Sequence, residues 1–428
     1  MKIYINPDKS TWRELLQRPV FETVSMEKTV SDILQSIKKE GDNAVKRYTL
    51  QFDQVAMEAL QVSEAEMQEA IQSLNEDLKK AIQIAKTNIE TFHRQQIQPI
   101  EVVETMPGVR CWRKSVGIEK VGLYIPGGTA PLFSTVLMLG IPAKLAGCRE
   151  IILCSPPNQE GKIHPAILYT ANLVGITKIF KVGGVQAIGA LAYGTETIPQ
   201  AYKIFGPGNQ YVTAAKQLVN KAGIAIDMPA GPSEVLVCAD DSANPAFVAA
   251  DLLSQAEHGV DSQVVLVAFD EKIVQKVQTE IEIQLAHLPR KDIAAKALDN
   301  SMAIVVKSQS EALDLINEYA PEHLILALEN AENFVESIVN AGSVFIGNYT
   351  PESVGDYASG TNHTLPTNGF AKAYSGVSVD SFVKKITFQQ LTKEGLQNVG
   401  PAVEKMAAAE ELEGHKMAVT LRLQEIGH

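Results

Sequence analysis

The chain has 428 residues, which predicts about two or three domains, each long enough to bury a hydrophobic core. Hydrophobic residues make up 45% and charged residues 21%, so collagen-like, low-complexity and largely disordered chains are excluded. The formal net charge is −12 and there is no long basic run, so we expect neither nucleic acid nor an anionic membrane surface as a partner.

Cysteine usage and hydropathy predict a cytoplasmic protein. The four cysteines form no CxxC pair and are Cys111, Cys148, Cys154 and Cys238. They are too few for a disulfide framework, which favours a reducing compartment, and no signal peptide is visible at the N-terminus. Residues 121–143 carry no charge and could span a bilayer, but Pro126, Pro131 and Pro142 interrupt them. We interpret them as a buried loop, a strand and a short helix.

The first hundred residues are expected to be mainly helical. Apolar residues recur at helical spacing over residues 26–48. Ser63 and Glu66 have the spacing of a capping box, so a helix is predicted from there to about residue 92.

From about residue 120, short apolar runs alternate with helical segments in two successive blocks. Strands are predicted at 150–154, 178–182, 202–205, 234–238, 264–268, 303–307, 324–328 and 343–346. Helices are predicted at 164–174, 185–193, 210–221, 244–257 and 272–285, with Asn244 and Pro245 as the start signal of the fourth. Serial βα units imply parallel sheets covered by helices on both faces.

The predicted fold class is therefore α/β, with two parallel-sheet domains in series. We place an N-terminal arm at 1–24 and a first domain at 25–232, whose residues 25–100 are helical. A second domain follows at 233–376, after a join near Ala230-Gly231-Pro232. A small appendage at 377–428 ends in a helix predicted over residues 401–423.

Three glycine pairs stand where strands should lead into helices or loops. Gly206-Pro207-Gly208-Asn209 is the best placed, because backbone N–H groups at a helix start can bind a phosphate. The dinucleotide fingerprint GxGxxG is incomplete, since residue 211 is tyrosine. Gly183-Gly184 and Gly127-Gly128 are similar, and a tight turn without a ligand fits all three equally well.

Four polar residues could form a metal site with nitrogen and oxygen donors. Gln255 and His258 are three residues apart at the end of a predicted helix, and so share one face. Asp356 lies in a loop rich in small polar residues, and His415 lies on the final helix near Glu410. Such donors suit zinc or another borderline metal. Surface residues with no ligand remain an alternative for each of the four.

Glu322 and His323 directly precede the apolar run 324–328. An acid and an imidazole beside a buried strand are suited to general acid–base catalysis. The pair comes before the strand, whereas ligands of α/β sheets usually bind at the carboxyl ends of strands. A capping glutamate and a structural histidine therefore remain an alternative.

Long motifs then give a resemblance that covers most of the chain except the first hundred residues. The chain closely resembles the histidinol dehydrogenases, a zinc- and NAD-dependent family that catalyses the end of histidine biosynthesis. The matching runs are VGLYIPGG from 121, VGGVQAI from 182, FGPGN from 205, IDMPAGPSE from 226, LSQAEHG from 253, APEHL from 320, GDY from 355 and NHTLPT from 362.

The resemblance implies two incomplete Rossmann-like domains and a four-electron oxidation of L-histidinol to L-histidine. Two NAD molecules are consumed, and L-histidinal stays bound between the steps. It also implies one Zn²⁺ per subunit, held by Gln255, His258, Asp356 and His415. The last ligand would come from the partner subunit of an interlocked, domain-swapped homodimer.

By the same resemblance, Glu322 and His323 are catalytic. His323 would take the O–H proton as hydride leaves carbon, and Glu322 would activate the water that hydrates the aldehyde. The implied substrate contacts are Ser233, Glu410, His323 and the four zinc ligands. The implied cofactor contacts are Tyr124, Gln186 and Asn209.

Glu411 departs from the family pattern, because the sequence before the last ligand reads EELEGH from Glu410 to His415. The spacing of Glu410 and His415 is kept. Three other functions stay open: a related dehydrogenase with another hydroxy substrate, a zinc hydrolase in which Glu322 drives a zinc-bound water, and a catalytically silent metal-binding protein. His363 is placed near the site without a role.

Overall fold

The computed structural model describes residues 1–19, 24–127, 130–229 and 231–427. Gly128 and Ala230, which belong to two of the motifs, lie outside the described residues. The chain divides into two compact units, which we describe separately. The first unit contains Met1–Gln96 and Ile118–Phe382, and the second contains Ile97–Gly117 and Val383–His428.

The first unit contains a five-stranded, all-parallel sheet. Its strand order is β6 (Lys178–Lys181), β5 (Glu150–Ser155), β4 (Lys120–Tyr124), β7 (Lys203–Phe205) and β8 (Ala225–Ile226). One face packs against α6 (Phe133–Leu145) and α7 (Pro165–Val174), and the other against α2 (Val24–Glu40), α8 (Gly184–Tyr193) and α9 (Gln210–Lys221). The chain runs from β4 toward one edge of the sheet and then returns to start β7 on the other side, so β4 and β7 form a topological switch point.

The same unit contains a six-stranded, all-parallel sheet. Its strand order is β1 (Lys2–Ile5), β11 (Met302–Val305), β10 (Gln263–Ala268), β9 (Glu234–Ala239), β12 (His323–Ala327) and β13 (Ser343–Ile346). One face packs on α10 (Pro245–Ala256), α11 (Glu271–Leu285) and α12 (Lys291–Asp299). The other packs on α1 (Trp12–Leu15), α13 (Gln309–Tyr319) and α14 (Glu332–Val335). The α/β fold class is thus confirmed.

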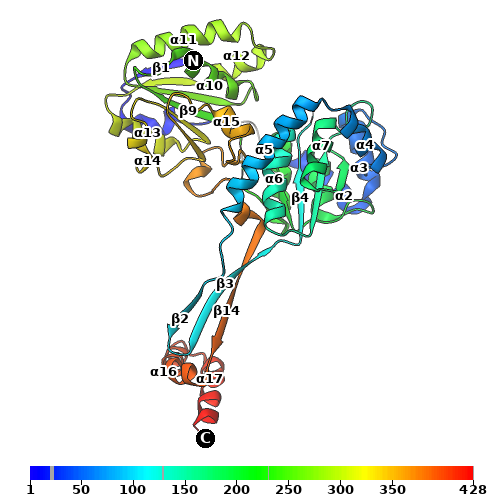
Figure 1. Ribbon diagram of the computed structural model, residues 1–428, viewed down its shortest axis with the longest axis vertical. Helices are drawn as coiled ribbons and strands as arrows, with labels where there is room; N and C mark the ends of the chain where they lie inside the picture. The colour runs from blue at the N-terminus through cyan, green and yellow to red at the C-terminus, as the bar shows by residue number, and fades with distance from the viewer. Residues whose placement is uncertain (20–23, 128–129, 230, 428) are drawn as a thin grey trace. The chain divides into compact units, whose positions relative to one another are not determined.

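The N-terminal arm supplies an edge strand to this second sheet, which the sequence did not predict. Lys2 pairs with Met302 and Ile5 with Val305, and Figure 1 shows β1 in blue within a sheet of much later residues. A four-residue strand at an edge carries too little hydrophobic pattern to be recognised locally. The proposed boundary near residue 232 stays a prediction.

The second unit is built on a three-stranded antiparallel sheet, with the order β14 (Val383–Leu391), β3 (Val109–Gly117) and β2 (Val102–Met106). Two helices follow β14, namely α16 (Lys393–Ala409) and α17 (Glu413–Ile426) (Figure 1). Residues 97–117 therefore belong with the C-terminal segment, although the sequence analysis assigned them to the first domain. The reason is the ladder from Val383 opposite Gly117 to Leu391 opposite Val109, which joins segments far apart in sequence.

Three helices predicted as continuous are each interrupted. The capping box at Ser63 is confirmed, but α4 (Glu64–Ser73) ends early and Asn75 caps a new helix, α5 (Glu76–Arg94). Gly41, with φ 55°, separates α2 from α3 (Asp42–Asp53). The predicted helix 401–423 is α16 and α17, because Glu411 has φ 58° and ends the first of them. Glu411 thus marks a helix end.

A buried ion pair supports the turn after β7. Lys216 Nζ lies 2.5 Å from Asp227 Oδ1, with the side chains 6% and 1% exposed. Gly206 N donates to Asp227 Oδ2 at 2.9 Å, and Lys216 Nζ donates to Gly206 O at 2.9 Å. Gly206 is required here, because its φ is 134° and a Cβ would lie 2.1 Å from Tyr124 O. The ion pair therefore fixes Gly206, the first residue of the motif Gly206-Pro207-Gly208-Asn209.

The helices within the described ranges include none that is both long and apolar enough to cross a membrane. The described part of the uncharged segment 121–143 instead contains β4 and most of α6. Pro126 and Pro131 lie between these two elements, as expected, but Pro142 lies inside α6 and does not end it.

Replacing Lys216 with methionine should destabilise the first unit. Removing one partner of a buried ion pair leaves an uncompensated charge and costs roughly 3–5 kcal/mol. We expect a lower urea midpoint, partly restored when Asp227→Leu is added. Lys28→Met is the matched control, because the Lys28–Asp32 pair is 80% and 66% exposed. Equal midpoints for Lys216→Met and the wild type would contradict the structural role of the pair.

Candidate active site

Glu322 and His323 lie at the amino end of β12, next to the start of β9. Both are buried, and Glu322 Oε2 accepts a hydrogen bond from Glu234 N at 3.0 Å. Ser233, a predicted substrate contact, directly precedes β9, so it lies at the same edge. The site of the second sheet is therefore at its amino edge, which explains why the pair precedes its strand in the sequence.

Three of the four predicted metal ligands lie near Glu322 and His323. Gln255, at the end of α10, has its Nε2 3.1 Å from His323 Nδ1. His323 Nε2 lies 3.2 Å from Asp356 Oδ1, which is carried by α15 (Glu352–Tyr357). His258 follows α10, and the charges of Asp356, His323 and Arg290 act on it. Residues from β12, α10 and α15 thus converge on one buried cluster.

Glu410, a predicted substrate contact, and His415, the fourth predicted metal ligand, are in the second unit. Glu410 is the C-cap of α16, and His415 is in the first turn of α17. His415 is exposed within the single chain. The fold of the second unit keeps the two residues on adjacent helices, five positions apart along the sequence.

Burial and charge strongly perturb the catalytic pair. Burial raises the pKa of Glu322 to about 8, although the charge of His323 opposes this. Burial alone would lower the pKa of His323, but the carboxylates of Glu322, Glu352 and Asp356 outweigh it and raise the pKa to about 10. Burial would raise the pKa of Asp356, yet its hydrogen bond to His323 lowers it. Such mutual perturbation in one buried cluster is typical of catalytic and metal sites.

Glu352 is a further buried residue of this cluster that the sequence did not predict. Donor atoms of His323, Glu352 and Asp356 all lie within 4.8 Å of one another, which is compatible with a metal ion. Glu352 is buried, and its Oε1 accepts a hydrogen bond from Gln255 Nε2 at 2.7 Å. The spacing of Glu352 and Asp356 could have revealed it, because residues four apart share a helix face.

The donor set fits a zinc ion. Gln255 Oε1 is buried and has no hydrogen-bond partner in the described part of the chain, which is costly unless a ligand binds it. His258 adds an imidazole, and burial lowers its pKa, which favours the neutral form that binds metals. Asp356 adds a carboxylate. Nitrogen and oxygen donors of this kind suit zinc.

His363 connects the metal-site loop to a helix of the first sheet. Its Nδ1 donates to Asp356 O at 2.8 Å, and its Nε2 lies 3.1 Å from Thr135 Oγ1 on α6. Burial lowers its pKa. Next to it, Asn362 Nδ2 donates to Met138 O at 2.6 Å. These bonds fix the loop that follows Asp356.

The three predicted cofactor contacts gather at the carboxyl edge of the first sheet. Tyr124 ends β4, and its hydroxyl accepts a hydrogen bond from Gly184 N at 3.2 Å. Asn209 caps α9 by accepting from Tyr211 N and Val212 N at 3.1 Å. Gln186, in the first turn of α8, donates from Nε2 to Asp53 Oδ2 at 3.3 Å. Dinucleotides bind at this edge of open parallel sheets, at the switch point.

Asp53 is a second residue that the sequence analysis missed. It is the last residue of α3, where the helix dipole disfavours a negative charge. Burial raises the pKa of Asp53 to about 6, against a hydrogen bond from Gln186 that lowers it. The carboxylate form is therefore less stable in the folded chain than in water.

Asp53→Asn should stabilise the fold at neutral pH. The pKa of Asp53 is higher in the folded than in the unfolded chain. The wild type therefore loses stability as pH rises from about 4 to 6, and this loss persists above pH 6. Asparagine keeps an acceptor for Gln186 without the charge. We expect a higher thermal midpoint than the wild type at pH 7.5, and a difference that shrinks toward pH 4.

The matched control is Asp299→Asn, because Asp299 is also the last residue of its helix, α12, but is exposed. It should change the midpoint less at both pH values. A gain for Asp53→Asn that is equal at pH 4 and pH 7.5 would refute the electrostatic explanation.

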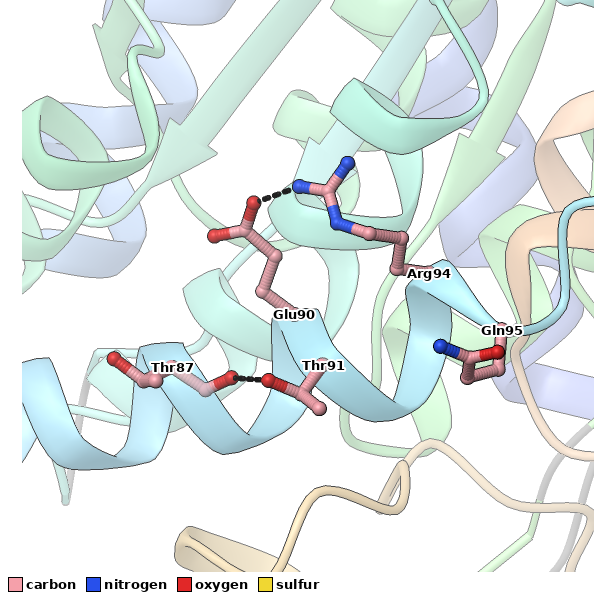
Figure 2. Close-up of a pocket in the computed structure, with 5 residues that line it drawn as sticks. All are labelled: Thr87, Glu90, Thr91, Arg94 and Gln95. Atoms are coloured by element: carbon pink, nitrogen blue, oxygen red, sulfur yellow. Dashed lines mark hydrogen bonds and ion pairs between the residues drawn. The ribbon is translucent and has the colours of Figure 1, made fainter.

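A shallow surface hollow lies along α5, lined by Thr87, Glu90, Thr91, Arg94 and Gln95 (Figure 2). Glu90 pairs with Arg94, and Thr91 Oγ1 donates to Thr87 O at 2.7 Å (Figure 2). None of the predicted site residues lines it. Glu322, His323 and Gln255 therefore do not line this hollow.

Comparison with known proteins agrees with this geometry. The sequence model of the histidinol dehydrogenase family matches residues 16–423. A histidinol dehydrogenase of Bacteroides thetaiotaomicron is 62% identical over 426 residues, with both chains fully covered. One from Pectobacterium atrosepticum is 52% identical over 96% of this chain and 93% of its own. The crystal structure of histidinol dehydrogenase from Elizabethkingia anophelis has a TM-score of 0.98 and 58% identity, covering 100% of this chain and 99% of its own. The chain belongs to the histidinol dehydrogenase family.

Proposed function

We propose that the protein oxidises L-histidinol to L-histidine, the final step of L-histidine biosynthesis, with two NAD as hydride acceptors. One observation carries the proposal. The buried pair Glu322 and His323 meets Gln255 and Asp356 in one hydrogen-bonded cluster, in a chain that matches histidinol dehydrogenases over its whole length. An enzyme of this pathway is expected in the cytoplasm.

His323 is the proposed base of both oxidations. When hydride leaves the carbinol carbon for NAD, the O–H proton must leave with it, and the neutral imidazole of His323 can take it. Because the pKa of His323 is raised to about 10, this neutral form is favoured at alkaline pH. The first oxidation gives L-histidinal. Glu322 activates the water that adds to this aldehyde, and His323 then removes the O–H proton of the hydrate as a second hydride leaves.

Zinc is the proposed anchor. The residues that would hold it are Gln255, His258 and Asp356, together with His415 of the partner subunit. When bound, the ion would fix the amino and imidazole nitrogens of the substrate and so place the reacting carbon. Ser233 and Glu410 are the further proposed substrate contacts.

The second unit favours a homodimer with shared sites. The 14-residue helix α17, which carries His415, has no buried residue within the single chain. Its Leu421 is 57% exposed, and on α16 Met406 is 65% exposed. Apolar side chains left open on an isolated helix pair usually have a partner surface. A second copy of the chain, exchanging this unit, would cover them and bring His415 to the metal site.

Tyr124, Gln186 and Asn209 are the proposed NAD contacts. They share the carboxyl edge of the first sheet with glycines that allow close backbone approach. A Cβ on Gly183 would lie 2.5 Å from Pro156 Cβ, so this turn admits only glycine. The incomplete GxGxxG therefore does not exclude a dinucleotide here.

Complete turnover of L-histidinol by the zinc-loaded protein should yield two NADH per substrate molecule. NADH absorbance followed to completion measures this ratio. A chelator should abolish the reaction and added zinc should restore it, since the metal places the substrate. One NADH would indicate a related single-step dehydrogenase. Turnover of a hydrolysable substrate without NAD would favour a zinc hydrolase, and no turnover would favour a silent metal-binding protein.

Substitutions in the catalytic pair should separate the two half-reactions. His323→Asn should lower the rate of both by roughly 10²–10⁴, the range for loss of a general base, while zinc content is kept. Glu322→Gln should slow oxidation of supplied L-histidinal more than oxidation of L-histidinol. Glu329→Gln, an exposed glutamate just after β12, is the control and should change neither. Equal loss of both steps in Glu322→Gln would remove its assigned role.

A further inference from the structure

We propose that Glu352 is a positioning residue that orients the side-chain amide of Gln255, so that Gln255 Oε1 faces the metal. The inference rests on the proposed zinc centre. It assigns a role to a buried carboxylate that is neither one of the four predicted ligands nor one of the catalytic pair.

The direction of the Gln255 amide follows from its neighbours. A side-chain amide has a donor face and an acceptor face. Glu352 Oε1 lies 2.7 Å from Gln255 Nε2, and an ionised carboxylate can only accept, so the NH₂ group faces Glu352 when Glu352 is ionised. The opposite atom, Gln255 Oε1, is buried and has no hydrogen-bond partner among the residues that the structure describes. It is therefore the atom left available to a metal ion.

Without Glu352, the orientation of this amide would be poorly defined. Gln255 Nε2 is also 3.1 Å from His323 Nδ1, but an imidazole nitrogen can either donate or accept. The carboxylate of Glu352 therefore favours the orientation of the Gln255 amide in which Nε2 faces Glu352. Supporting groups that orient metal ligands in this way typically change metal affinity by about 10–100-fold when removed.

The short helix α15 fixes two of the predicted ligands at once. Its first residue, Glu352, holds Gln255, and four residues later Asp356 provides its own carboxylate. Residues four apart lie on the same helix face, which brings both groups to the same cluster. Glu352 is 1% exposed, so water cannot replace it as the acceptor.

Glu352 could also bind the ion directly, because it lies within 4.8 Å of the His323 and Asp356 donor atoms and the described residues offer its Oε2 no hydrogen-bond partner. In that arrangement Glu352 Oε1 would have to give up or share the 2.7 Å bond to Gln255, and Gln255 would lose its orientation. The two arrangements predict different coupling between Glu352 and Gln255.

The test is a double-mutant cycle on zinc affinity, measured with the full-length protein by competition with a chromophoric chelator. Glu352→Leu removes the acceptor at similar volume and should weaken zinc binding about 10–100-fold. Glu352→Gln keeps an acceptor oxygen and should lose less than tenfold. Thermal unfolding of the metal-free variants controls for folding, and Glu352→Gln provides the isosteric variant if Glu352→Leu folds poorly.

The decisive comparison is made in the Gln255→Ala background. If Glu352 acts through Gln255, adding Glu352→Leu should cause no further loss of zinc affinity. Losses that multiply would overturn the proposal and indicate direct ligation by Glu352. Unchanged affinity in Gln255→Ala alone would instead remove Gln255 from the metal centre, and with it the role of Glu352.

Discussion

The active site depends on one constraint: ionisable groups can be buried only if they bond to one another. At the amino edge of the second sheet, Glu322, His323 and Glu352 are buried and Asp356 is nearly so, and each would be costly to desolvate alone. They are stabilised as a cluster, in which the imidazole of His323 lies among three carboxylates. The backbone of β9 and the amide of Gln255 supply the remaining hydrogen bonds. The chemistry is possible because the fold brings these elements to one point.

The two parallel sheets use opposite edges. In the first sheet, the carboxyl edge at the switch between β4 and β7 carries the residues proposed to bind NAD. In the second sheet, the amino edge carries the acid, the imidazole and the metal donors. Within the first unit, the loop after Asp356 contacts α6, which packs on the first sheet. His363 bonds Thr135, and Asn362 bonds Met138.

The second unit combines a three-stranded antiparallel sheet with two helices. Its sheet joins residues before β4 to residues after Phe382, and its last helix, α17, has no fully buried residue within one chain. An isolated helix of this length is marginal in water, and α17 packs on α16, where Val419 and Leu423 lie beside Gly400.

Local signals in the sequence determined much of this protein. Alternating strands and helices, the capping box at Ser63 and the start of α10 at Asn244 and Pro245 each depend on a few neighbouring residues. The motif residues from Tyr124 to Asp356 were also identified in advance, and the structure places them at two sheet edges. The end of α16 at Glu411 was not foreseen, because a left-handed residue other than glycine has no strong signal.

Only the tertiary structure decided which distant segments meet. Lys2 pairs with Met302, Gly117 pairs with Val383, and Gln255 bonds a carboxylate 97 residues later. Asp53 reaches Gln186 in the same way. Periodicity and capping carry no information about such contacts, since their energies arise from burial and pairing between elements that are remote in sequence. For this reason the resemblance could suggest a set of metal ligands, but only the fold showed that Glu352 lies beside Gln255.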